Sequence, residues 1–505
     1  MPPTNIHAGR DPMIDAGRGR QARACLLAFA MLLLSASFAT AATAATAPLA
    51  QFNRETYAYS TTLSTSQEAN RYQVMVLQGT DHAQVPLLKA ANPNLKILMY
   101  SNLLTTNPSD GPAWAECTSY AADNASHPSW FLLDSHGKRI ALSGYAGNYV
   151  MDVGNTAYQQ ACVSHALSLA TQYKFDGIYF DGAAADLAYA VPAGVTVPKY
   201  PTRAAWQPAV YSLLSHATPQ IHTQHRLLVG NIGGGATQAG LWQKWTGAMD
   251  GSMEESWMDS SVSYFWPQMA ADTAWSEANG KIALLHSHYT TETGNTFGLA
   301  EMMLVARGKS SYSTSNVNYQ NSELWFPEYR TAQSLGAATS GSTRLGNGIS
   351  ARAFANGVVL AKTSGSPATV NLLGGTYSGS QLSKVTRATM STSSGLILLK
   401  DVPSGGPSLP PFDVVAPTIT GSLAPGQTVT ANPGLWSAVP TPAYTYQWKR
   451  CLTTSLKTCT PISGATRSTY QVQSGDSGHY LSMTVTASNS GGARIGYSPL
   501  SAQVS

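Results

Sequence analysis

Charge is the property that this sequence of 505 residues has least of. Asp, Glu, Lys and Arg make up 11% of it, against about 25% in typical soluble proteins, and the formal net charge is +4. The basic residues are dispersed, so the clustered Lys and Arg that contact phosphates in nucleic-acid-binding proteins are missing. We therefore expect no nucleic-acid partner.

Several signature motifs are also missing. No G-x-G-x-x-G or GxxxxGK[ST] occurs, and "GNIGGG" at 230–235 has the wrong spacing for either, which disfavours nucleotide-binding folds. No G-x-S-x-G elbow supports a serine hydrolase, and no CxxC supports a Cys-rich zinc site. "HSH" at 286–288 and "HTQH" at 222–225 have no evident third ligand. We expect no metal and no cofactor.

Long hydrophobic runs are almost absent, and the main one lies near the start. Four arginines precede "CLLAFAMLLLSASFA" at 25–39, and a string of small residues with A-x-A-like cleavage options follows. This pattern predicts a signal peptide at 1–46, because the run is too short for a confident membrane span. A retained anchor is the alternative. We expect a secreted, extracellular protein with no membrane contact after cleavage.

Cysteine is scarce, but its number is informative. Beyond Cys25 there are four, namely Cys117, Cys162, Cys451 and Cys459, and an even number in an exported protein predicts disulfides. Three pairings are possible. The large gap in the sequence favours Cys117–Cys162 and Cys451–Cys459.

Short β-like runs alternate with segments of helical length between residues 55 and 320. The eight runs lie at 54–60, 71–79, 95–102, 175–182, 226–233, 251–257, 282–290 and 309–315. Eight strands that alternate with helices predict an α/β fold of the (β/α)8 TIM-barrel type. A doubly wound α/β sheet is the alternative. A long excursion at 103–165 separates the third and fourth strands, where loops shape the active-site face of such barrels.

The pattern changes to β only from about residue 345. We expect the barrel at 47–340, a small antiparallel β-domain at 341–402, a Pro/Gly/Ser linker at 403–414 and a β-sandwich at 415–505. In the last part "YTYQWKRC" and the D-x-G-x-Y spacing of "DSGHY" resemble an immunoglobulin-like module of secreted bacterial enzymes. Ser482 stands where that pattern has its second cysteine. Such a module acts as a spacer or makes cell-wall or glycan contacts.

The stretch "FDGIYFDG" at 175–182 contains two aspartates that the strand sends to opposite faces and opposite ends. They are five residues apart, about 16 Å along an extended strand. Asp176 lies at the strand entry, at the bottom of the barrel, where a turn-forming role is expected. Asp181 ends the strand at the top, where the catalytic groups of this fold collect.

A second acid is available in "MDGSMEESW", at the end of the sixth expected strand. Glu254 and Glu255 are adjacent, so only one can face the barrel axis. A carboxylate pair across the barrel mouth suits glycosidic-bond hydrolysis, with one group as nucleophile or base and the other as acid.

The resemblance to a known family is carried by "FDGIYFDG", "LLVGN", "MDGSMEESW", "HPSWFLLDSHGKRI" and "GNYVMDVGN". These resemble a group of hypothetical TIM-barrel glycosyl hydrolases related to the α-galactosidase and endo-α-1,4-polygalactosaminidase families. "ARAFANGVVLAKTSGSPATVNLLGGTY" resembles the β-domain that follows many such barrels. The resemblance implies Asp181 as nucleophile and an acid after strand six as acid/base, and favours Glu255 over Glu254.

Other expected strand ends and loops supply candidates for holding the sugar of a polysaccharide or oligosaccharide substrate. These are Gln78, Tyr100, Asn102, Asp152, Asn231, His286, His288 and Tyr289, while Trp114, Trp130, Trp257 and Trp266 are candidates for stacking. The function expected is a secreted glycoside hydrolase that cleaves O-glycosidic bonds of an extracellular polysaccharide, with retention of configuration. The alternative is a non-catalytic carbohydrate-binding or cell-surface adhesion protein.

Overall fold

A computed structural model describes eight stretches of the chain. They are residues 50–52, 65–108, 116–145, 147–315, 326–401, 409–439, 442–489 and 491–505. The expected signal peptide at 1–46, the expected first strand at 54–60 and the first half of the expected linker, 403–408, lie outside them. Within these stretches no helix has the length and apolar character needed to cross a bilayer.

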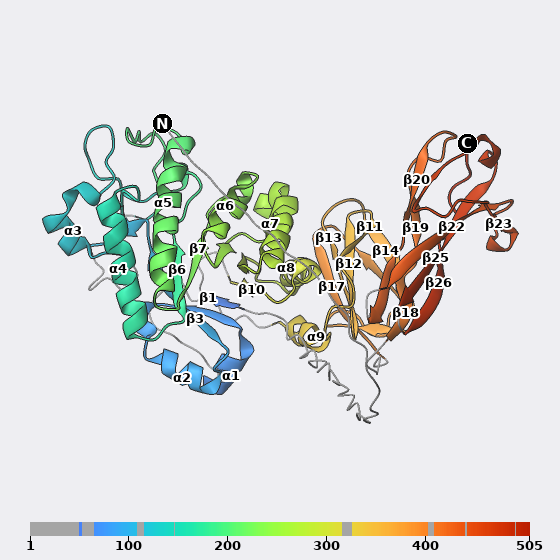
Figure 1. Ribbon diagram of the computed structural model, residues 1–505, viewed down its shortest axis with the longest axis horizontal. Coiled ribbons are helices and arrows are strands. Elements are labelled where there is room, and N and C mark those ends of the chain that lie inside the picture. The colour runs from blue at the N-terminus through green and yellow to red at the C-terminus, as the bar shows by residue number, and fades with distance from the viewer. Residues whose placement is uncertain are drawn as a thin grey trace, which may run out of the picture. The chain divides into compact units, whose positions relative to one another are not determined.

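The first part of the chain forms the expected TIM barrel (Figure 1). Eight parallel strands are hydrogen-bonded in the order β1-β2-β3-β6-β7-β8-β9-β10, and the end strands β1 and β10 contact each other. The strands are β1 Ala50–Phe52, β2 Val74–Leu77, β3 Lys96–Asn102, β6 Gly177–Asp181, β7 Leu227–Asn231, β8 Gly251–Glu254, β9 Ile282–Ser287 and β10 Ser310–Thr314. Seven of them overlap the strands expected from the sequence.

Helices alternate with the strands, as the sequence predicts. They are α1 Thr65–Arg71, α2 Gln84–Ala91, α4 Thr156–Gln172, α5 Arg203–His222, α6 Leu241–Gly247, α7 Trp266–Ala278, α8 Glu292–Val305 and α9 Glu328–Ser334. Helix α4 begins where the Asn155 side chain accepts bonds from the amides of Ala157 and Tyr158. It buries Cys162 and Ala166, and Figure 1 shows it beside α5, which it contacts.

The excursion after β3 is a folded insertion. It contains β4 Thr105–Thr106, α3 Tyr120–Ser126 and β5 Tyr149–Val150, and β4 pairs antiparallel with β5. The Cys117–Cys162 disulfide ties this insertion to α4, and both cysteines are fully buried. The predicted pairing is confirmed.

The barrel is followed by antiparallel β structure. The next strands are β11 Thr343–Gly346, β12 Ile349–Phe354, β13 Gly357–Lys362, β14 Ala368–Asn371, β15 Tyr377–Ser378, β16 Arg387–Met390 and β17 Ser394–Lys400. This domain shares a core with the barrel at α8. Arg352 Nη1 donates to the carbonyls of Met303 and Ala306, and a Cβ on Gly395 would lie 2.5 Å from the Thr296 carbonyl oxygen.

The C-terminal part is also antiparallel β. Its strands are β18 Leu409–Val415, β19 Thr418–Thr420, β20 Thr428–Asn432, β21 Leu435–Val439, β22 Ala443–Cys451, β23 Cys459–Pro461, β24 Thr469–Gln471, β25 Tyr480–Asn489 and β26 Gly492–Tyr497. Trp448 is fully buried in its core, and Ser482, in the place of the second cysteine, bonds to Ser498. The immunoglobulin-like assignment stays a prediction.

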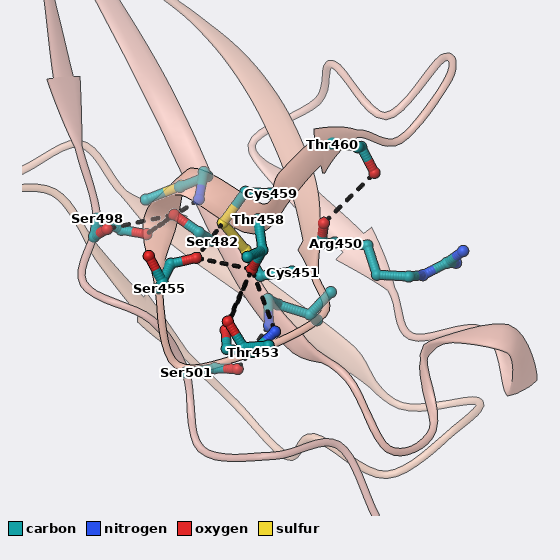
Figure 2. The surroundings of a disulfide bond; sticks show 12 residues. Arg450, Cys451, Thr453, Ser455, Thr458, Cys459, Thr460, Ser482, Ser498 and Ser501 are labelled. Carbon is teal, nitrogen blue, oxygen red and sulfur yellow. Dashed lines mark hydrogen bonds between the residues drawn. A yellow bond between two sulfur atoms is a disulfide. The ribbon is translucent and has the colours of Figure 1, made fainter.

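The second disulfide is local to this part. Cys451 and Cys459 are opposite each other in the β22–β23 pair, as Figure 2 shows. Within the loop between these cysteines, the Thr458 hydroxyl donates to the Ser455 carbonyl at 2.8 Å. This pairing too is the one that the sequence predicts.

Candidate active site

One row of side chains fills the interior of the barrel. It is an apolar cluster made by alternate residues of six strands, namely Val74, Val76, Leu98, Tyr100, Tyr179, Val229, Met253 and Leu284. Because side chains alternate along a strand, the residue two positions further on also faces the axis, but at the carboxyl end. Those positions are Gln78, Asn102, Asp181, Asn231, Glu255 and His286. The sequence-predicted polar residues therefore meet at one end of the barrel.

Asp181 is buried, 4% exposed, and a hydroxyl, an amide and a backbone N–H are among the groups that bond to its carboxylate. The Tyr100 hydroxyl donates to Oδ2 at 2.7 Å, and the Asn231 amide donates to Oδ1 at 2.9 Å. The backbone N–H of Gly182 also donates to Oδ1 at 2.9 Å, from a residue with φ +85°. Glycine suits this turn because it has no Cβ and therefore adopts a φ in the left-handed region without steric strain.

Asn231 joins the two candidate carboxylates. Its Nδ2 donates to Asp181 Oδ1 at 2.9 Å and to Glu255 Oε2 at 2.7 Å, so these oxygens are at most about 5.6 Å apart, the sum of the two lengths. Only an amide NH2 offers two protons to two acceptors, which fixes the orientation of this side chain. Its own Oδ1 is buried and has no hydrogen-bond partner among the described residues.

Glu254 lies on the opposite face of β8 from Glu255. It shares that face with Ser252, whose hydroxyl bonds to Thr246 of α6 at 2.8 Å. Burial raises the pKa of Glu254 from 4.5 to about 8, and nearby Asp272 of α7 adds to the rise. Glu254 is thus a buried carboxyl group between β8 and the helices, outside the barrel interior.

The segment that follows Glu255 is fastened to the end of β9. The Trp257 N–H donates to the His286 carbonyl at 2.8 Å, and the Ser287 hydroxyl donates to the Trp257 carbonyl at 2.6 Å. Asp259 accepts two bonds from His288, from the backbone N–H at 2.9 Å and from Nδ1 at 2.6 Å. These bonds fix the path of the chain that carries Glu255.

The two histidines of "HSH" have different surroundings. His288 Nδ1 donates to Oδ2 of Asp259, because a carboxylate oxygen can only accept a hydrogen bond. His286 is 1% exposed and lies between two hydroxyls, Ser313 at 2.8 Å from Nδ1 and Ser315 at 2.9 Å from Nε2. The centres of the two rings are 5.3 Å apart, so both histidines lie at the same part of the barrel mouth.

Three residues that the sequence predicts to bind substrate instead form hydrogen bonds that hold loops of the barrel in place. Asp152 accepts a bond from the Tyr200 hydroxyl at 2.6 Å and pairs with Lys199, which ties the excursion to the loop after β6. Asn102 Oδ1 accepts from the Leu104 and Thr105 amides at 2.9 and 3.1 Å. The Tyr289 hydroxyl donates to the Met258 carbonyl, so it supports the loop after β8.

The tryptophans proposed for stacking on sugar belong to the core. Trp130, Trp257 and Trp266 are 8%, 0% and 5% exposed, so their ring faces are covered by protein. Trp114 lies outside the described residues. The stacking prediction is wrong for these three, since the large aromatic area is used to fill the interior.

Sequence reasoning missed Asp259, Ser313 and Ser315. The two serines alternate along the end of β10, and the same two-residue rule that places His286 could have found them. Asp259 follows a turn in which Met258 has a φ of +57°, so strand periodicity did not reach it.

A separate cavity of about 730 Å³ lies at the other end of the barrel. Strand-entry residues line it, among them Gln73, Lys96, Leu227, Asp250 and Ile282. It opens away from Asp181 and Glu255 and contains neither, so its size does not make it the site of the carboxylate chemistry.

The eight parallel strands define the fold class as a TIM barrel. The chain belongs to hypothetical glycosyl hydrolase family 15, whose model matches residues 89–358. No curated protein matches the sequence.

Three crystal structures of other proteins are similar in arrangement. Ega3 of Aspergillus fumigatus, in complex with galactosamine, is 13% identical with a TM-score of 0.37, over 55% of this chain and 95% of that one. The GH36 α-galactosidase AgaA of Geobacillus stearothermophilus is 12% identical with a TM-score of 0.38, over 66% and 52%. The α-amylase of Geobacillus thermoleovorans is 9% identical with a TM-score of 0.41, over 71% and 100%.

Proposed function

We propose that this protein is an exported glycoside hydrolase that cleaves O-glycosidic bonds of an extracellular polysaccharide. Asp181 is the nucleophile and Glu255 the acid/base. The observation that carries the proposal is the Asn231 amide, which bonds to both carboxylates and holds their nearest oxygens within about 5.6 Å. Retaining glycosidases have carboxyl groups about 5–5.5 Å apart, whereas inverting ones need about 6.5–9.5 Å to admit a water.

The first step forms a bond between an Asp181 oxygen and the anomeric carbon. The bond from that carbon to the leaving oxygen breaks, and Glu255 gives its proton to that oxygen. Tyr100, Asn231 and Gly182 orient Asp181 without neutralising it, because none of these donors is charged. In the second step Glu255 takes a proton from water, the water oxygen bonds to the anomeric carbon, and Asp181 leaves.

Export is supported by the cysteines. Two disulfides, Cys117–Cys162 and Cys451–Cys459, are typical of proteins that fold in an oxidising compartment. The expected signal peptide at 1–46 agrees with this proposal.

The test is release of reducing sugar from a panel of polysaccharides by wild type, Asp181→Asn, Glu255→Gln and Glu254→Gln. We expect losses of at least about 10³-fold in the first two variants, since each removes a group that acts on the reacting atoms. Glu254→Gln is the matched control and keeps activity. We expect NMR of the first product to show that the configuration at the anomeric carbon is retained.

Two outcomes would overturn the assignment. Full rates in both Asp181→Asn and Glu255→Gln would exclude the carboxylate pair. Binding without turnover by wild type, unchanged in Glu255→Gln, would indicate the carbohydrate-binding or adhesion function.

A further inference from the structure

In "GNIGGG", whose spacing does not match a nucleotide-binding motif, Gly234 makes room for a tyrosine. Gly234 has a φ of +75°, and a Cβ on it would lie 2.8 Å from a ring carbon of Tyr189 and 2.9 Å from its hydroxyl oxygen. Real Cβ atoms do not approach so closely, so any other residue would displace the ring. Three successive glycines at 233–235 lose more conformational entropy on folding than other residues would. The Tyr189 ring lies against the backbone of this turn at Gly234.

Tyr189 is nevertheless 56% exposed, and Ala188 before it is also exposed, whereas Leu187 and Ala190 on either side of this pair are buried. It ends the short 3-10 helix Leu187–Tyr189, in which Leu187 is 7% exposed, and Ala190 directly after it is 0% exposed. Asp186 caps this helix by accepting from the Ala188 N–H at 3.0 Å, and Arg203 of α5 pairs with Asp186. The exposed ring is therefore held by a fixed support.

The two loops that position Tyr189 directly follow the strands of the candidate active site. Gly234 comes three residues after Asn231, and Tyr189 comes eight residues after Asp181. The two loops are joined by a hydrogen bond from the Ala185 N–H to the Gly233 carbonyl at 2.8 Å. Tyr189 thus stands on the rim of the barrel mouth, beside the strand ends that carry Asp181 and its amide partner.

We propose that Tyr189, supported by the glycine turn at 233–235, is a stacking platform for a pyranose ring of the polysaccharide next to the bond that is cut. A tyrosine suits this role because its apolar ring face packs on the C–H face of a sugar while its hydroxyl stays hydrated. The buried Trp130, Trp257 and Trp266 cannot do so. The inference rests on the proposed function and adds the residue that holds the neighbouring sugar unit.

The kinetic test compares Tyr189→Ala and Tyr189→Phe with Tyr497→Ala. Tyr497, in the C-terminal β structure, is 53% exposed and is the matched control. On the polysaccharide that wild type degrades, Tyr189→Ala raises KM by about 3- to 10-fold, the size of one aromatic contact. Tyr189→Phe keeps the ring and stays within about twofold of wild type. Tyr497→Ala leaves KM unchanged.

Equal KM values for Tyr189→Ala and wild type would overturn the platform while leaving the carboxylate mechanism intact. If wild type degrades none of the polysaccharides, electrophoresis in gels that contain galactomannan, soluble starch, pectin or glycol chitosan is decisive. Retardation of wild type that is lost in Tyr189→Ala and kept in Tyr497→Ala supports the platform. Equal retardation of all variants, or none, rejects it.

Discussion

The two ends of strand β6 carry the same residue type in opposite chemical settings. At the entry, Asp176 accepts bonds from the Lys89 ammonium at 3.0 Å and from the Ile97 N–H at 2.9 Å. At the exit, Asp181 is held by a phenol, an amide and a backbone N–H, none of them charged. The carboxylate at the entry pairs with an ammonium group and ties elements together, whereas the bonds from Tyr100, Asn231 and Gly182 orient the carboxylate at the exit.

The same contrast separates the two faces of β8. Glu255 meets Asn231 on the inner side, whereas Glu254 is buried on the outer side against the helices. A raised pKa alone would select Glu254 as the acid of the reaction. Its side of the strand argues against that choice, because a general acid must reach the leaving oxygen.

Among the changes that test these two contrasts, the largest effect is expected from removing the amide between the carboxylates. Asn231→Asp replaces the shared donor by a third acceptor, so Asp181 and Glu255 lose their common partner. We expect kcat to fall by at least about 10²-fold, comparable to loss of one transition-state donor. Asn279→Asp, at an exposed amide after α7, controls for the added charge. Equal kcat in Asn231→Asp and wild type would contradict the bridging role.

The next effect concerns the entry end of β6 and is one of stability. Asp176→Ala leaves the Ile97 N–H and the Lys89 ammonium without their acceptor, so the free energy of unfolding should fall by about 1–3 kcal/mol. Urea unfolding measures it, and activity per folded molecule should not change. A loss of kcat at unchanged stability would show that the two ends are not as distinct as the bonding indicates.

A third effect is a pH dependence of stability from Glu254. Its pKa is about 8 in the folded protein against an ordinary 4.5, so the unfolded chain binds fewer protons between these values. Stability from this group is therefore complete below pH 4.5 and is lost as the pH rises toward 8, with a slope of at most about 1.4 kcal/mol per unit.

Glu254→Gln should remove this slope. The variant gains stability relative to wild type as the pH rises from 5 to about 8, and unfolding curves across that range measure the difference. Glu292→Gln, at the start of α8, serves as the control. Parallel curves for wild type and Glu254→Gln would show that Glu254 is ionised in the folded state.

Strand periodicity explains how much of this could be read from the sequence. Alternation places Asp181, Asn231 and His286 on the axis, and the barrel itself follows from strands that alternate with helices. It does not say which polar groups bond to each other, since that depends on side-chain reach across strands. The Asn231 bridge was therefore not predicted.

Loops were predicted least well, for a physical reason. The partners of Asp152 are Lys199 and Tyr200, some 47 and 48 residues further along the chain, and no local pattern encodes such a contact. Asp259 bonds to His288 and directly follows Met258, which adopts a left-handed conformation that a non-glycine residue rarely takes, so strand periodicity does not predict this contact. The tryptophans were misjudged because their burial is decided by packing.

The two disulfides offer a means of addressing the two ends of the chain separately. The chain-entropy model gives about 4 kcal/mol for the loop of 45 residues closed by Cys117–Cys162 and about 2.5 kcal/mol for the loop of 8 closed by Cys451–Cys459. Both sulfurs of the larger loop are buried, whereas Cys459 is partly exposed. A brief, mild reduction would therefore admit a thiol-reactive dye or surface anchor at the C-terminal part first. The barrel would stay oxidised and could be immobilised with its mouth unmodified.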